Sequence, residues 1–257
     1  MGGFSIASVV LSYFLTAGGL LGGSILITKL HTTSEAVALL CWALGSFVGG
    51  FFAARASRGS TIIEPAIGAV LVVLTLVLTV TGSDAGKLMW HSGPTGVGKF
   101  IAEMAAALVV GAAAGAFVSE KMFGEATTSG APWILYSALC AFGSAFMTAT
   151  VITILMLKKD STLDDLVKAV LLGSAGGAVL GGIAIGASAR LRVLGPAFLG
   201  GAIGVAGMFM LGLTQKGSTE GHTAEAATGL AILALGGGIA TLIGAAIGWS
   251  AIGKRNA

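Results

Sequence analysis

A stripe of hydroxyl-bearing residues near the beginning of the chain is its most suggestive polar pattern. Ser5, Ser8, Ser12 and Thr16 are spaced by three, four and four residues, which places them on one face of a helix. A similar stripe recurs in the second half of the chain, with one thiol in place of a hydroxyl, at Ser137, Cys140, Ser144 and Thr148. Such a face could line a path for water, a small neutral solute or a partly dehydrated ion. Alternatively, the hydroxyls could bond to carbonyls of their own helix or join neighbouring helices.

Ionisable side chains are scarce within the apolar stretches. Glu64 stands beside Pro65, and both residues favour the first turn of a helix. Glu103 follows Lys99 by four residues, which is the spacing of an ion pair on a helix surface. Proton- and sodium-coupled carriers usually keep an ionisable side chain in mid-membrane. The sequence offers no obvious residue of that kind, which argues against a proton-coupled pump.

No arrangement of residues predicts catalysis or a cofactor. Residues 93–99 read GPTGVGK, like a phosphate-binding loop, but Phe100 stands where Ser or Thr would hold magnesium. We therefore expect a flexible glycine loop there and no nucleotide binding. The histidines lack Cys or carboxylate neighbours at ligand spacing, so no metal site is expected. Cys41 and Cys140 lie in apolar runs and are interpreted as core thiols. We do not expect an enzyme.

Arginines gather in two corresponding loops, at Arg55, Arg58, Arg190 and Arg192. Pairs of basic residues beside a membrane typically bind anionic lipid headgroups and fix the topology. The alternative is that they guide an anionic substrate towards the mouth of a path.

The elements that would position these residues are membrane-spanning helices. The chain has 257 residues, of which 55% are hydrophobic and 10% charged, against roughly 25% charged in soluble domains. A bilayer core takes about 20 apolar helical residues per span. Eight windows fit, at about 4–28, 36–54, 62–82, 100–119, 132–157, 166–187, 193–214 and 227–251. The predicted fold class is an all-α membrane protein.

The chain also resembles two copies of one unit. We predict one four-helix repeat over 1–128 and a second over 129–257, inserted with the same orientation and related by a pseudo-two-fold axis along the membrane normal. Glycines four residues apart recur in both halves, at Gly45, Gly49, Gly177 and Gly181, and again at Gly111, Gly115, Gly244 and Gly248. Small residues at this spacing predict close helix packing.

Two functions follow from this pattern. The first is a small transporter or channel-like protein, with a path near the repeat interface lined by the hydroxyl stripes. The second is a non-catalytic membrane subunit or scaffold that packs against a partner complex. The expected partners are the lipid bilayer and a second copy or another membrane protein, with no nucleic acid. The expected location is a bacterial inner membrane. All five arginines lie on the side of the termini, which favours both termini in the cytoplasm.

Overall fold

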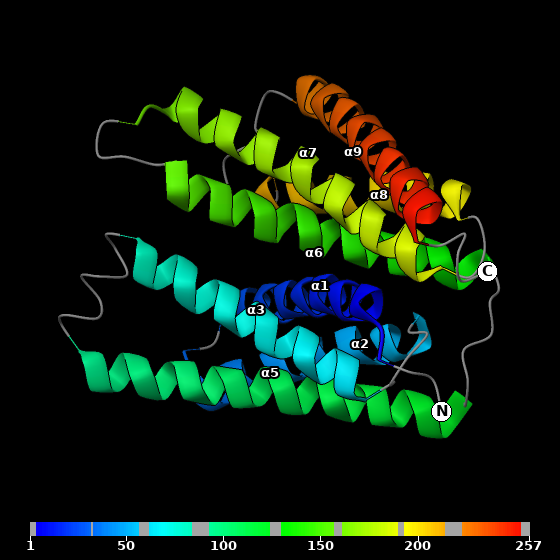
Figure 1. Cartoon of the computed structure of the whole chain (residues 1–257). Helices are drawn as coiled ribbons and strands as arrows, with labels where there is room; N and C mark the ends of the chain where they lie inside the picture. The colour runs from blue at the N-terminus through cyan, green and yellow to red at the C-terminus, as the bar shows by residue number, and fades with distance from the viewer. Residues whose placement is uncertain are drawn as a thin grey trace. The chain divides into compact units, whose positions relative to one another are not determined.

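Every described segment that forms regular structure is helical. The computed structural model describes residues 4–31, 33–56, 62–83, 93–123, 130–156, 161–189, 193–213 and 223–252, and contains no strand within them (Figure 1). The helices are α1 (Ile6–Leu30), α2 (Glu35–Ala56), α3 (Ile63–Gly82), α5 (Pro94–Phe123), α6 (Gly130–Met156), α7 (Leu163–Ser188), α8 (Leu194–Leu213) and α9 (Thr223–Ala251). The prediction of an all-helical protein is confirmed for these residues.

Seven of the described helices are long and apolar enough to cross a membrane, and the described apolar stretch of α8, Leu194–Met210, is shorter. The chain is therefore consistent with a polytopic integral membrane protein. One expectation from the sequence is wrong. The residues Pro94–Lys99, expected as a flexible loop, form the first turns of α5. Proline at the first helical position explains this start, because its φ angle is already helical and its missing N–H is not needed there.

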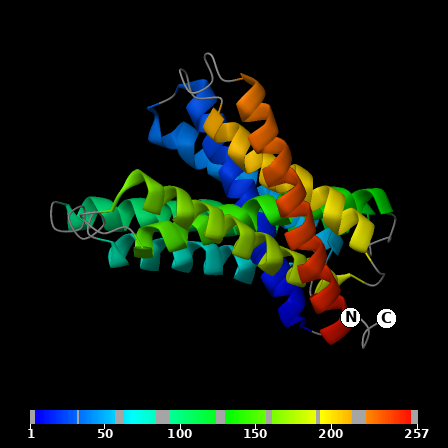
Figure 2. The same ribbon diagram turned by 90° about the horizontal axis from the view of Figure 1, so that it is seen from above.

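The chain divides into two compact units, which are described separately. Unit 1 comprises Met1–Thr127 and Thr153–Asp160, and unit 2 comprises Thr128–Ile152 and Ser161–Ala257. In unit 1, α1 packs against α2 and α3, and α5 packs against the same two helices. The pair α1 and α2 crosses the pair α3 and α5, as the view from above shows (Figure 2).

In unit 2, the last helix packs against the second and third helices of the unit. Helix α9 contacts α7 and α8, while the described part of α6 contacts α7 near Gly177 and α8 near Gly200. The pair α8 and α9 crosses the pair α6 and α7 (Figure 2). Unit 2 therefore has the same order of helix contacts as unit 1.

Glycines allow the backbones to touch where these helices cross. A Cβ atom on Gly45 would overlap the carbonyl of Gly19 in α1, and one on Gly115 would overlap the carbonyl of Phe47 in α2. In unit 2, a Cβ atom on Gly248 would overlap the carbonyl of Ile183. A side chain larger than a hydrogen atom would therefore not fit at these positions without moving the neighbouring helix.

The outward faces are apolar. On α2, Leu40, Leu44 and Val48 follow one another at the spacing of one helix face and are exposed. On α9, Ile239, Ile243 and Ile247 form a similar exposed row within unit 2. An apolar face of this kind suits contact with acyl chains, and it agrees with the length and hydropathy of the helices.

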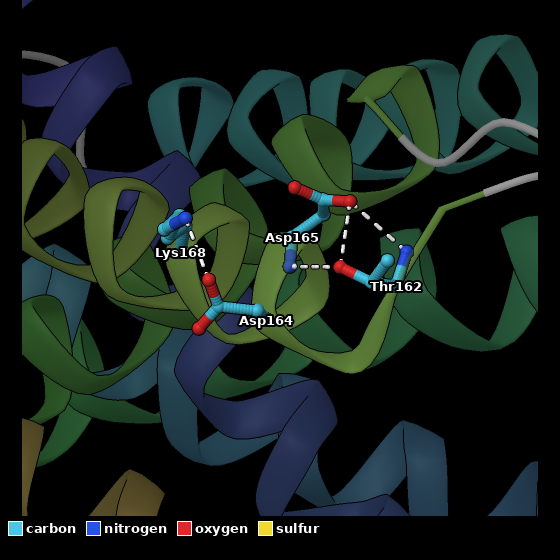
Figure 3. Close-up of polar contacts among 4 residues, drawn as sticks. All are labelled: Thr162, Asp164, Asp165 and Lys168. Atoms are coloured by element: carbon cyan, nitrogen blue, oxygen red, sulfur yellow. Dashed lines mark hydrogen bonds and ion pairs between the residues drawn. The ribbon is translucent and has the colours of Figure 1, made fainter.

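Helix α7 begins with a complete capping box. The Oγ1 atom of Thr162 accepts a hydrogen bond from the N–H of Asp165 at 3.3 Å, and Oδ2 of Asp165 accepts one from the N–H of Thr162 at 2.9 Å (Figure 3). Lys168 pairs with Asp164 at 2.6 Å on the same turn. The box satisfies two N–H groups that a helix start otherwise leaves without partners. It therefore fixes where α7 begins.

Candidate functional site: the polar seams of the first helices

The hydroxyl stripe of α1 lies inside unit 1. Ser8, Ser12 and Thr16 are buried, and Ser5 caps the helix. A Cβ atom on Gly68 of α3 would lie 2.8 Å from the Cβ of Ser12, and one on Gly49 of α2 would lie 2.7 Å from the Cα of Thr16. The stripe therefore faces the contact surfaces between α1 and its neighbours α2 and α3, which we call seams.

The corresponding stripe of α6 faces the seams of unit 2. Ser137, Cys140 and Ser144 are fully buried, whereas Thr148 is partly exposed. Ser137 lies against Gly200 of α8. Ser144 lies against Gly181 of α7, whose carbonyl accepts a hydrogen bond from the Sγ of Cys140 at 3.6 Å. The expectation that Cys41 and Cys140 are buried free thiols is confirmed.

The hydroxyls of these stripes differ in their hydrogen bonding. The Oγ of Ser12 donates to the carbonyl of Ser8 at 2.7 Å, and the Oγ of Ser144 donates to the carbonyl of Ala141 at 3.2 Å. By contrast, the buried Thr16 Oγ1 and Ser137 Oγ have no hydrogen-bond partner in the described part of the chain. A buried hydroxyl without a partner costs roughly 1–3 kcal/mol. Each stripe therefore keeps an unsatisfied hydroxyl inside its unit.

Glu64 is the buried carboxylate that sequence reasoning underestimated. The sequence identified it as an acid at a helix start, and the structure shows it fully buried, with its Oε1 accepting a hydrogen bond from the N–H of Ser5 at 2.7 Å. One signal could have revealed this. Gly68 follows Glu64 by four residues, so the glutamate shares the α3 face that contacts α1.

The polar and aromatic contacts continue along the same seam and at the end of the unit. The hydroxyl of Tyr13 donates to the Oγ1 of Thr75 across α1 and α3 at 3.2 Å. The guanidinium carbon of Arg55 lies 5.0 Å from the ring centre of Phe123, at the ends of α2 and α5. Such cation–π contact can hold the side chain in place beside a membrane surface.

The remaining predicted sites are only partly described. Arg58, Arg190 and Arg192 lie outside the described residues. The Lys99–Glu103 ion pair is confirmed, with 3.4 Å between Nζ and Oε1. Among the described residues, no group of three or more His, Cys, Asp or Glu side chains could hold a metal ion.

Comparison of the chain with protein-family models, with curated proteins and with solved structures returned no match. The fold and the apolar helices therefore define its class, a polytopic helical membrane protein, on their own. Within that class, the seams between each first helix and its neighbours are the strongest candidate site.

Proposed function

We propose that this protein is a small membrane transporter or channel-like protein, built from two copies of a four-helix unit and conducting a small polar solute or ion. The path would be lined by the hydroxyl stripes of α1 in unit 1 and of α6 in unit 2. The observation that carries the proposal is that each stripe holds a buried hydroxyl with no hydrogen-bond partner among the described residues, Thr16 in unit 1 and Ser137 in unit 2. A moving solute can supply the hydrogen bonds that these oxygens lack.

The contacts within each unit support the duplication. Gly68 lies on Ser12 and Gly200 lies on Ser137. The two contacts are equivalent if the units are aligned so that Gly68 of α3 corresponds to Gly200 of α8 and Ser12 of α1 corresponds to Ser137 of α6. The helix bounds agree with this correspondence, because α1 starts at Ile6 and α6 starts at Gly130. The hydroxyl pattern instead pairs Ser12 with Ser144, which lies about two turns beyond Ser137. The contacts therefore favour a shifted alignment of the first helices.

The last helix of each unit, α5 in unit 1 and α9 in unit 2, also supports the duplication, but with a different alignment from the one that the sequence favours. Gly115 lies on the carbonyl of Phe47, and Gly244 lies on the carbonyl of Val179. These contacts pair Gly115 with Gly244, and the starts of α5 and α9 align in the same register. The order of the glycines along the sequence instead pairs Gly111 with Gly244, and Gly111 lies about one turn before Gly115. Because glycines recur every fourth residue in these helices, the sequence alone fits both alignments.

The alternative function is a non-transporting subunit or scaffold. It is favoured by Ser12 and Ser144, which donate hydrogen bonds within their own helices. It is also favoured by Gly49, Gly68 and Gly200, which close the seams tightly around the stripes. In that case the hydroxyls only join helices.

Conservative substitution of the unpartnered hydroxyl in each stripe separates these functions. We expect Thr16→Val and Ser137→Ala, singly and together, to lower flux through the purified protein in liposomes while the melting temperature stays the same or rises. Stability is kept because each change removes an unsatisfied buried hydroxyl and leaves the volume nearly unchanged. The probes are urea, glycerol, Na⁺ and K⁺. Leucine at Ser12 or Ser144 would be a poorer test, because the neighbouring glycines leave it no room.

The matched control is Thr81→Val, which changes a hydroxyl that donates to Val77 at 2.8 Å near the end of α3. It should leave flux unchanged. No flux of any probe in the wild-type protein, together with a stoichiometric protein partner found by mass spectrometry after mild extraction, would contradict transport and support the subunit.

A further inference from the structure

The start of α1 is held against the start of α3 by a buried carboxylate. The N–H of Ser5 donates to the Oε1 of Glu64 at 2.7 Å, and the side chain of Glu64 is fully buried. Ser5 is the N-cap of α1, and its Oγ accepts a second bond from the N–H of Ser8 at 3.3 Å. The carboxylate of one helix thus helps to cap another.

The contact places the carboxylate of Glu64 at the N-terminus of α1. A helix N-terminus carries a partial positive charge and N–H groups without partners in the helix. A hydrogen bond from such an N–H to a carboxylate is roughly twice as strong as one between neutral groups. A membrane interior or a packed helix seam screens this attraction less than water does. The contact between Ser5 and Glu64 therefore resists separation of α1 from α3.

Only unit 1 has a carboxylate at this position of its third helix. Gly68, one turn after Glu64, lies on Ser12, whereas in unit 2 Gly200 lies on Ser137. The residue four positions before Gly200 is Pro196, which has no carboxylate. The seam of unit 2 thus serves as an internal comparison for the seam of unit 1.

We infer that Glu64 is an electrostatic latch, a positioning residue that keeps the seam between α1 and α3 closed. Neutralising it would free the first turns of α1 and open the part of the seam that holds Ser8 and Ser12. This inference goes beyond transport, because it concerns the opening of one seam whether or not a solute passes.

Thiol labelling in native membranes tests the latch directly. In a chain with Cys41→Ala and Cys140→Ala, Ser12→Cys and Ser137→Cys each provide a single buried reporter, one facing Gly68 and the other facing Gly200. The rate of alkylation by N-ethylmaleimide then reports how often each seam opens. We expect Glu64→Gln to raise the rate at position 12 about tenfold and to leave the rate at position 137 unchanged.

Two further variants keep the test decisive. Ser5→Pro removes the N–H donor, together with the Oγ that accepts from the N–H of Ser8, and leaves the carboxylate in place, so it should also raise the rate at position 12. Glu103→Gln neutralises a carboxylate that pairs with the exposed Lys99 and should change neither rate. Unchanged labelling at position 12 in both Glu64→Gln and Ser5→Pro would overturn the latch. Equal increases at positions 12 and 137 would also overturn it, because they would indicate a general loss of packing. Since flux is not measured, failure here is distinct from failure of the transport proposal.

Discussion

At the scale of single residues, the glycines at the helix crossings should be the least tolerant positions. We expect Gly45→Ala to destabilise the protein by about 1–3 kcal/mol, because the new methyl group would overlap the carbonyl of Gly19 and force α1 and α2 apart. The matched control is Gly22→Ala, since a Cβ atom there meets nothing within 4 Å. Thermal unfolding in detergent compares the two. A melting temperature equally unaffected by both changes would contradict the close contact.

The residues that could be predicted from the sequence are those with a simple period. The spacing of Ser8, Ser12 and Thr16 places them on one face of α1, and all three are indeed buried together. The sequence could not say what covers that face, because Gly49 and Gly68 come from other helices. The stripe's proposed role as a path lining stays a prediction.

Glu64 shows a different limit of sequence reasoning. A glutamate beside a proline at a helix start is common on a surface, where it costs nothing. Its burial follows from the contact between α1 and α3, which brings the N–H of Ser5 to its carboxylate. The spacing of Glu64 and Gly68 could place the glutamate on a packed helix face, but periodicity within one helix carries no information about which group its carboxylate meets.

At the scale of elements, the capping box should decide how firmly α7 begins. We expect Thr162→Ala to increase hydrogen exchange of the amides in the first turn of α7, because the N–H of Asp165 loses its acceptor. Thr162→Ser keeps the hydroxyl and should preserve protection. Hydrogen exchange followed by mass spectrometry measures both variants. Equal exchange in the two would show that tertiary packing, not the cap, fixes this helix start.

The presence of each helix could be predicted because a long, continuous apolar run has few structures open to it other than a membrane-spanning helix. All eight predicted windows correspond to described helices, including 62–82, which matches α3 closely. The starts were less predictable. Helix α5 begins at Pro94, well before the window expected from Phe100 onward, because helical residues can extend beyond the apolar run that identifies a span. Hydropathy identifies the part of a helix that can lie in lipid, and it does not identify the residue at which the helix begins.

At the scale of the whole molecule, the separation of buried polar and exposed apolar side chains is what identifies a membrane protein. Within each unit, the hydroxyls of the first helix face its neighbours, while rows such as Leu40, Leu44 and Val48 face outward. A soluble bundle would reverse this pattern. The arrangement makes lipid the natural surroundings of both units.

The number of crossings is the feature of the whole molecule that most constrains its topology, and α8 decides it. Its 20 residues span about 30 Å, enough for a bilayer core. Successive contacts join Ser137 with Gly200 and Ala138 with Gly204, so α8 runs in the same direction as α6. The contact of Gly201 with Thr241 and that of Val205 with Gly237 show that it runs opposite to α9. Packed in this way between two spans, α8 should itself cross the membrane.

Eight crossings would place both termini on one side, and we predict that this side is the cytoplasm because all five arginines lie on it. We expect a fluorescent protein fused at either terminus to fold in the cytoplasm and alkaline phosphatase fused at the same positions to stay inactive. Fusions in the loop between α8 and α9 should give the opposite result, which controls for insertion. Termini on opposite sides would mean that α8 does not cross. The two units would then have unequal numbers of crossings, and the parallel duplication behind the proposed path would fail.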